Sequence, residues 1–247
     1  MNYCLGTQNG TKENVMDTLE SDTEETEAGK QIVLFANWVE PRDRTTLSVL
    51  ILDRSGSMKE YGDAPIKAVN DHIRKLQEAA DGCNYLFGLV SFADAPRLEI
   101  DITDVKRIEL LQAIECDGQT LLYETVWRTI NLLYNRYLNL TDREQSLLKV
   151  VIGVISDGAD NQSPSSQPGR LKNLAELVRS FGWETLVFGI GVSGKVLAEK
   201  MGFTVDDQHA FDLAADRSSL NASSITLTQT TLGGWTAKDH DHDSGSV

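Results

Sequence analysis

Four apolar runs along the middle of the chain have the composition of buried β-strands. They lie at residues 47–52, 84–94, 149–156 and 183–191. Short, near-continuous runs of branched and aromatic residues are typical of parallel strands that are covered on both faces. A weaker run at 97–102 follows Ala95-Pro96 and predicts a hairpin, which places an antiparallel strand at the sheet edge. The segment 209–214 predicts the last strand.

Between these runs, apolar residues recur at the three- and four-residue spacing of amphipathic helices. One such series begins at Ile66 and ends at Ala80, and another begins at Leu122 and ends at Tyr137. Further helices are expected at 169–182, at 194–202 and near 216–224. We expect His72 to lie on the polar face of the first helix. The alternation predicts an α/β fold: a doubly wound, mostly parallel sheet with one antiparallel edge strand and helices on both faces.

Charge separates the chain into a body and two acidic tails. Residues 1–31 contain seven acids and two bases, and residues 235–247 contain three acids and one base, so the tails hold half of the net charge of −14. We expect residues 1–30 to be a disordered acidic tail, 31–234 to be one folded domain and 235–247 to be a flexible acidic tail. The segment 31–39 is apolar enough to form a strand or to pack on the body.

The apolar run at 47–52 leads directly into a cluster of hard oxygen atoms. Asp53, Ser55 and Ser57 follow it on one short loop around Gly56. Ligands in open α/β sheets bind beyond the carboxyl ends of the strands, where this loop is expected. One carboxylate and two hydroxyls are oxygen ligands that suit Mg²⁺. Asp, Ser and Gly are also common turn residues, so the pattern by itself fits an ordinary turn equally.

Two later segments offer further oxygen ligands. Thr120 precedes the helical series that begins at Leu122, and Asp157 follows the strand predicted at 149–156. Taken separately, Thr120 fits a helix N-cap and Asp157 fits a turn. Their order and spacing after Asp53 add weight to a metal site.

With these positions, the chain resembles a von Willebrand factor type A domain that carries a metal-ion-dependent adhesion site. The resemblance spans residues 45 to about 215, although Leu121 stands where many members have proline. It implies that five residues surround one divalent cation, Mg²⁺ or else Mn²⁺ or Ca²⁺: Asp53, Ser55, Ser57, Thr120 and Asp157. It further implies that the hydroxyls touch the metal, while the carboxylates act mainly through water. A neutral inner shell would leave the ion free to bind a carboxylate of a partner protein.

A nucleotide-binding enzyme is the competing interpretation. Residues 189–196 match the Gly-x-x-x-x-Gly-Lys of a P-loop between a predicted strand and a predicted helix. Val196, however, stands where the P-loop requires Ser or Thr to bind Mg²⁺. The serines lack a Gly-x-Ser-x-Gly context, so hydrolase chemistry is unsupported as well. We therefore expect a binding module with no catalytic residues.

Composition also bears on partners and location. A net charge of −7 on the body disfavours nucleic acid, since phosphate backbones require a basic face. Three cysteines without metal-ligand spacing are expected to be reduced thiols. Because no basic region is followed by an apolar segment near residue 1, and no apolar stretch approaches the length of a membrane span, we expect neither a secretory segment nor a membrane span. We expect a cytoplasmic protein. Its resemblance to stand-alone bacterial domains from tellurite-resistance, stress and defence systems suggests a kinase, a phosphatase or an AAA+ ATPase as a neighbour.

Overall fold

The computed structural model describes residues 37–38, 40–80 and 83–233. The strands are β1 (Thr45–Asp53), β2 (Asn84–Phe92), β3 (Pro96–Asp104), β4 (Leu148–Ser156), β5 (Glu184–Ile190) and β6 (Ala210–Leu213). The helices are α1 (Ala64–Ala79), α2 (Leu122–Leu138), α3 (Asp142–Leu147), α4 (Gln167–Ser180), α5 (Gly194–Met201) and α6 (Arg217–Leu232). Two 3₁₀ helices, η2 (Gly56–Tyr61) and η3 (Val105–Arg107), follow β1 and β3.

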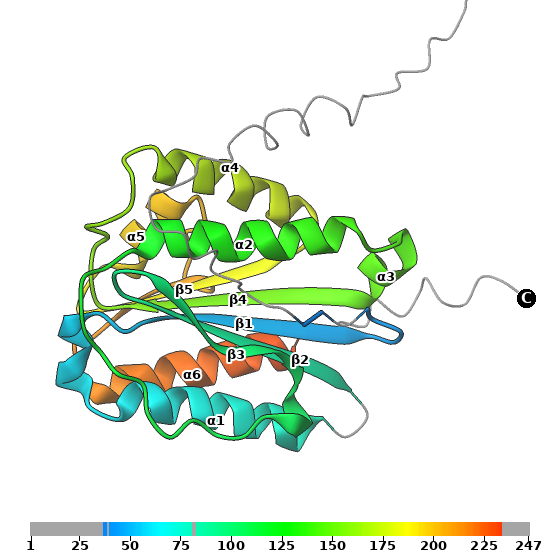
Figure 1. The fold of residues 1–247 in the computed structure, drawn as a ribbon, viewed down its shortest axis with the longest axis horizontal. Helices are drawn as coiled ribbons and strands as arrows, with labels where there is room; N and C mark the ends of the chain where they lie inside the picture. The colour runs from blue at the N-terminus through cyan, green and yellow to red at the C-terminus, as the bar shows by residue number, and fades with distance from the viewer. Residues whose placement is uncertain (1–36, 39, 81–82, 234–247) are drawn as a thin grey trace, which may run out of the picture. The chain divides into compact units, whose positions relative to one another are not determined.

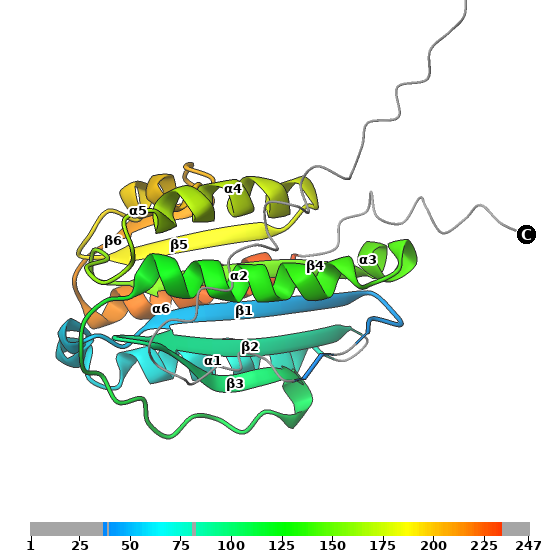
Figure 2. The same ribbon diagram turned by 45° about the horizontal axis from the view of Figure 1, so that its top comes forward.

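The described strands form one mixed sheet with helices on both of its faces. The strand order is β3-β2-β1-β4-β5-β6, and β3 alone among them runs antiparallel to its neighbour. Helices α1 and α6 pack together on one face, and α2 and α4 lie side by side on the other (Figures 1 and 2). The predicted α/β fold with an antiparallel edge strand is therefore confirmed.

The direction of winding reverses at β1. From β1 the chain passes through α1 to β2 and β3 on one side, and then returns through α2 to β4 on the other side. In open α/β sheets such a switch point creates a crevice beyond the carboxyl ends of the strands. The crevice here lies beyond the last residues of β1 and β4.

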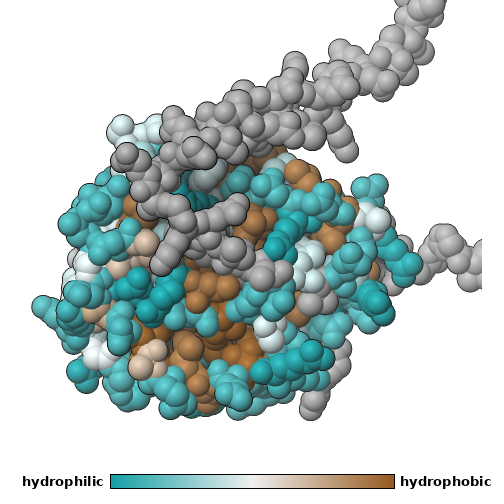
Figure 3. Space-filling model, in the orientation of Figure 1, coloured by the Kyte–Doolittle hydropathy of each residue, from teal (hydrophilic) through white to brown (hydrophobic). Residues whose placement is uncertain are grey.

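The core is built from the apolar residues that the sequence pattern identifies. Every residue of β1 is buried, and the inward face of α1 includes fully buried Ile73 and Leu76. Partly buried Ile100, Ile108 and Leu110 pack against the same core from β3 and the segment after it. In the space-filling view, apolar side chains gather over that region of the surface (Figure 3).

Helix α6 is longer than the sequence pattern predicts, and its buried face is largely polar. The expected helical segment near 216–224 extends to Leu232. On its buried face, the hydroxyls of Thr228 and Thr231 donate to carbonyl groups one turn earlier. A buried hydroxyl that is satisfied within its own helix costs little to desolvate. On β4, Gly153 leaves room for the side chain of Leu227, so α6 approaches the sheet closely.

The prediction that His72 lies on a polar helix face is wrong. The side chain is fully buried between α1, β1 and α6, where Nε2 lies 3.1 Å from Ser48 Oγ and Nδ1 lies 2.8 Å from Thr228 Oγ1. Both partners are far away in sequence, so helical periodicity around His72 could not reveal them. Burial, together with the nearby positive charge of Lys75, lowers the pKa of His72 to about 3.

Several expectations concern residues outside the described ranges. The acidic segments 1–30 and 235–247 fall there, as does most of 31–39. Of that last segment, Asn37 donates its backbone N–H to Asp101 of β3 at 2.9 Å. Two helices that no pattern predicted, η2 and α3, are both six residues long, which is too short for a clear apolar periodicity.

Since His72 is neutral in the folded protein, its stability contribution should depend on pH. Below pH 6.5 the unfolded chain protonates this imidazole, whereas the folded protein resists protonation down to about pH 3. We expect the free energy of unfolding to decrease on acidification in this window, by up to roughly 1 kcal/mol per pH unit from His72. Urea unfolding of the wild type and His72→Gln between pH 7 and pH 5 measures the effect. Parallel pH profiles for the two proteins would contradict it.

Candidate metal centre

Two loops meet beyond the carboxyl ends of β1 and β4 and are fixed to each other through their backbones. Asp53 is the last residue of β1, and Ser55 and Ser57 lie at the start of η2. The amide of Gly56 donates to the carbonyl of Gly118 at 3.0 Å, and the amide of Asp117 donates to the carbonyl of Arg54 at 2.9 Å. The loop after β1 is therefore held against the segment that leads to Thr120.

The five residues predicted from the sequence come together at this place. Ser55 Oγ lies 3.1 Å from Ser57 Oγ, and Ser57 Oγ donates to Asp157 Oδ1 at 2.8 Å across one hundred positions of sequence. Thr120 is buried, and its hydroxyl lies beside Gly158, where an added Cβ would be 3.5 Å from Oγ1. The structure thus brings three hydroxyls and two carboxylates into one cluster. Their role as metal ligands stays a prediction.

The two carboxyl groups of the cluster have perturbed affinities for protons. Burial raises the pKa of Asp53, although hydrogen bonds from Ser156 and Ser55 partly oppose the increase. Burial also raises the pKa of Asp157 to about 6, against the hydrogen bond from Ser57, and the negative charge of Asp53 adds to the increase. In both cases burial is the largest cause of the increase, because it disfavours the charged form of a carboxyl group.

Ser156 is a functional candidate that sequence reasoning missed. Its hydroxyl donates to Asp53 Oδ2 at 2.6 Å, while the amide of Ser55 donates to Asp53 Oδ1 at 2.8 Å. Both oxygens of the carboxylate are therefore oriented by fixed donors. The usable signal was the parallel alignment of the two apolar runs, because Leu52 pairs with Ile155 and the next residues are then neighbours.

In the segment resembling a P-loop, one backbone amide and one hydroxyl donate to a carboxylate of the protein itself. Asp212 Oδ1 of β6 accepts from Ser193 Oγ at 3.0 Å and from the Lys195 amide at 3.1 Å, in front of α5. The Lys195 ammonium instead pairs with Asp207 at 2.7 Å. An aspartate thus lies where a P-loop would place a phosphate group.

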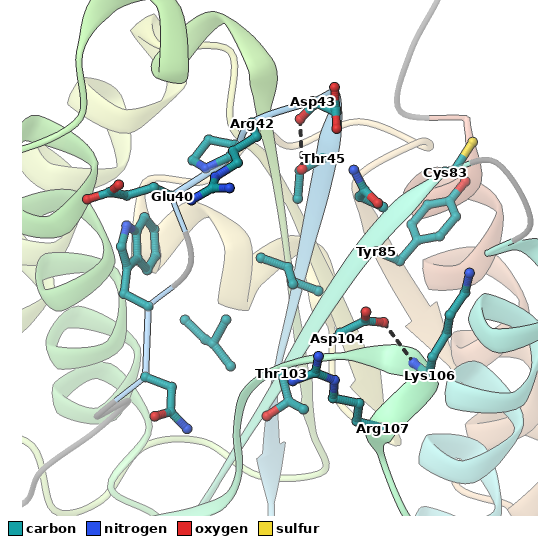
Figure 4. A pocket seen from close by; sticks show the side chains of 16 residues that line it. Glu40, Arg42, Asp43, Thr45, Cys83, Tyr85, Thr103, Asp104, Lys106 and Arg107 are labelled. Carbon is teal, nitrogen blue, oxygen red and sulfur yellow. Dashed lines mark hydrogen bonds between the residues drawn. The ribbon is translucent and has the colours of Figure 1, made fainter.

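A separate pocket lies at the opposite end of the strands. It has a volume of about 910 Å³ and includes Thr45 and Asn84, the first residues of β1 and β2. Charged side chains of both signs line it, among them Arg42, Asp43 and Arg107 (Figure 4). None of the five residues of the oxygen cluster lines this pocket.

Comparison with known proteins agrees with the fold. The family model described as "von Willebrand factor type A domain" matches residues 49–224. No curated protein sequence matches the chain significantly. Across the described residues, every helix is too short or too polar to cross a membrane.

Two solved structures illustrate the similarity. The pilus adhesin SpaC from Lactobacillus rhamnosus GG, in an open conformation, aligns with a TM-score of 0.57 at 14% identity over 78% of this chain. The match covers only 30% of the SpaC chain. The vWF domain of the type V pili tip protein Mfa5 from Porphyromonas gingivalis aligns with a TM-score of 0.56 at 13% identity, over 81% of this chain and 98% of that one. Identities this low show a shared fold alone.

Removing the Ser156 hydroxyl should destabilise the protein, because the buried Asp53 carboxylate loses its shortest hydrogen bond. For Ser156→Ala we expect the free energy of unfolding to decrease by about 2 kcal/mol at pH 7 without added metal. Urea denaturation measures this, with Ser180→Ala as the control, since Ser180 is an exposed hydroxyl on α4. A loss no greater than that of the control would show that the bond to Asp53 adds nothing.

Proposed function

Because the chain belongs to the von Willebrand factor type A domain family, whose members generally mediate protein–protein interactions, we propose that it is a metal-dependent interaction module. In this proposal Mg²⁺, or Mn²⁺ or Ca²⁺ in its place, binds among Asp53, Ser55, Ser57, Thr120 and Asp157. The ion then recruits an Asp or Glu carboxylate of a partner protein. The chain acts by binding, without catalytic residues.

The observation that carries the proposal is the assembly of the oxygen cluster from distant parts of the sequence. Ser57 and Asp157 are in hydrogen-bond contact, and Thr120 lies beside the residue that follows Asp157. Hydroxyl and carboxylate oxygens are ligands suited to hard divalent cations. The raised pKa values of Asp53 and Asp157 support the fit, since a nearby cation would stabilise their charged forms.

Each residue would have a distinct part in holding the ion. Ser55, Ser57 and Thr120 would supply neutral oxygens to it, and Asp53 and Asp157 would balance its charge mainly through water. Ser156 and the Ser55 amide already orient Asp53 for this part. A bound cation with neutral inner ligands keeps a strong preference for an anion, which is the chemical reason for proposing a partner carboxylate.

Acidic residues near the cluster restrict the charge that a partner protein can carry around its carboxylate. Glu60 and Asp117 are exposed on the loops that form the cluster, and Asp94 is exposed on the neighbouring turn between β2 and β3. Asp117 pairs with Lys59 at 3.1 Å. An acidic surface would repel a partner whose carboxylate lies among other acids. We propose a protein partner that carries its carboxylate among neutral or basic groups, and no nucleic acid partner.

The cellular setting is proposed on composition and family resemblance. Cys83 and Cys116 are both free thiols, which fits the reducing environment of the cytoplasm. Among stand-alone bacterial members of the family, a stress or defence role beside a kinase, a phosphatase or an AAA+ ATPase is the setting we propose. The two pilus proteins named above share the fold with this chain, and their adhesive context is not carried over.

The metal site is tested by comparing identical substitutions at the two ends of β1. We expect Asp53→Asn to weaken Mg²⁺ and Mn²⁺ binding at least tenfold, because it removes a buried negative charge from the cluster. Asp43→Asn, at the opposite end of the strand, should bind like the wild type. Isothermal titration calorimetry measures both variants after circular dichroism has shown that they are folded. Equal affinity of Asp53→Asn and the wild type would refute the metal assignment.

Partner binding is tested in the same set of proteins. Immobilised wild type should retain a partner from lysate in the presence of Mg²⁺, and should lose it with EDTA and with Asp53→Asn. A partner retained equally under all three conditions would contradict metal-dependent recruitment.

The nucleotide-binding alternative predicts that the protein binds and hydrolyses ATP or GTP, whereas the proposed function predicts neither. We expect neither binding nor hydrolysis of ATP or GTP, because Asp212 accepts from the Lys195 amide at the start of α5 and Lys195 pairs with Asp207. A fluorescent nucleotide titration and a phosphate-release assay measure this. Hydrolysis that is lost in Lys195→Ala but kept in Ser55→Ala would favour a P-loop enzyme.

A further inference from the structure

The N-terminus of α2 obtains its capping groups from a different part of the chain. Its N-cap residue is Leu121, whose side chain cannot accept a hydrogen bond. The first amides of a helix lack partners within the helix, so a buried helix start requires acceptors from elsewhere. Here they come from residues 160–163, in the loop between β4 and α4.

Asp160 and Ser163 cap the first turn. The Tyr123 amide donates to Asp160 Oδ2 at 2.7 Å, and the Glu124 amide donates to Ser163 Oγ at 2.9 Å. Asp160 Oδ1 accepts from the Ser163 amide at 2.8 Å, and Oδ2 accepts from the Ser163 hydroxyl at 2.5 Å. The negative charge at the start of α2 is also favourable for the helix dipole.

Asn161 binds the residue that precedes the helix. The backbone N–H of Thr120 donates to the side-chain oxygen Oδ1 of Asn161 at 3.0 Å. The backbone N–H of Asn161 donates to the Thr120 carbonyl at 3.1 Å. These two bonds form a reciprocal pair between segments that lie 41 residues apart. Asp157, in the same loop as Asn161, accepts a hydrogen bond from Ser57. The next residue, Gly158, lies beside the hydroxyl of Thr120.

We infer that Asn161, supported by Asp160, is a positioning residue that fixes Thr120 relative to Asp157, so that two oxygen ligands from separate loops move as one unit. With regard to the metal, the inference rests on the proposed function; with regard to the linkage of the two loops, it rests on the contacts alone. The amides on both sides of Thr120 are held by the turn between β2 and β3, since Gln119 donates to Asp94 Oδ1 at 2.8 Å and Leu121 donates to the carbonyl of Ala93 at 2.9 Å. The bond to Asn161 instead ties the amide of Thr120 itself to the loop that carries Asp157. Removing a residue that hydrogen-bonds to a metal ligand commonly weakens metal binding by about 10- to 100-fold.

A purely stabilising role for Asn161 would have a different signature. A cap that only stabilises α2 would change the unfolding temperature and leave the affinity of the folded protein for metal unchanged. A positioning role requires that the folded, metal-free protein lose order at Thr120 and that metal affinity decrease with it.

Three variants separate these roles. Asn161→Ala removes the acceptor of the Thr120 amide, Asn161→Asp keeps an acceptor at the same place, and Asn173→Ala removes an exposed asparagine on α4 as the matched control. Hydrogen exchange on metal-free protein measures protection of residues 120–124, and calorimetry measures Mg²⁺ and Mn²⁺ affinity. Should Asn161→Ala fail to fold, Asn161→Ser takes its place, since its shorter side chain does not reach the amide.

We expect Asn161→Ala to exchange faster at 120–124 and to bind metal about 10- to 100-fold more weakly. Asn161→Asp should restore protection and bind at least as well as the wild type, and Asn173→Ala should match the wild type in both measurements. Wild-type protection and affinity in Asn161→Ala would overturn the inference. If the wild type binds no metal, the proposed function fails, and the exchange data alone decide the linkage: unchanged protection at 120–124 then rejects it.

Discussion

The alignment of β1 with β4 is the constraint on which the candidate site depends. The two strands are parallel and pair from Thr45 with Leu148 to Leu52 with Ile155, so both end at the same edge of the sheet. Asp53 and Ser156 then lie in hydrogen-bond contact, and the residues after each strand begin loops in the same crevice. A shift of one residue in this register would turn Asp53 to the other face of the sheet, because side chains alternate along a strand.

The parts of the fold that sequence could predict are those with a repeated apolar pattern. The strands, the antiparallel edge and the long helices α1 and α2 follow from it, and the structure confirms them. The positions Asp53, Ser55, Ser57, Thr120 and Asp157 could be named from spacing and resemblance, and the structure brings them together. Spacing could not give the distances between them, since these depend on how the backbone of Gly56 meets Gly118.

Other features depend on partners far away in sequence. His72 fits a polar helix position by periodicity, yet it is buried because Ser48 and Thr228 satisfy both ring nitrogens. In the sequence, nothing distinguishes Asn161 from an ordinary loop residue, although its side chain accepts a hydrogen bond from the Thr120 amide. Helix α6 carries an apolar pattern too weak to mark its end, and its buried hydroxyls on Ser223, Thr228 and Thr231 are bonded to carbonyl groups of the same helix. A local sequence pattern can predict how a residue is placed within its own helix or strand. It cannot predict the contacts that the residue makes with other elements.

The direction of α6 determines which end of the sheet the last described helix reaches. The helix begins near the crevice, where the guanidinium of Arg217 lies against Gly62, and it runs toward the start of β1, where Thr231 contacts Ser48. Thr45 begins β1 and Leu232 ends α6 toward the end of the sheet opposite to the oxygen cluster, roughly one strand length or 30 Å distant. The start of β1 and the end of α6 therefore contribute nothing to the crevice, which is built from the opposite ends of the strands.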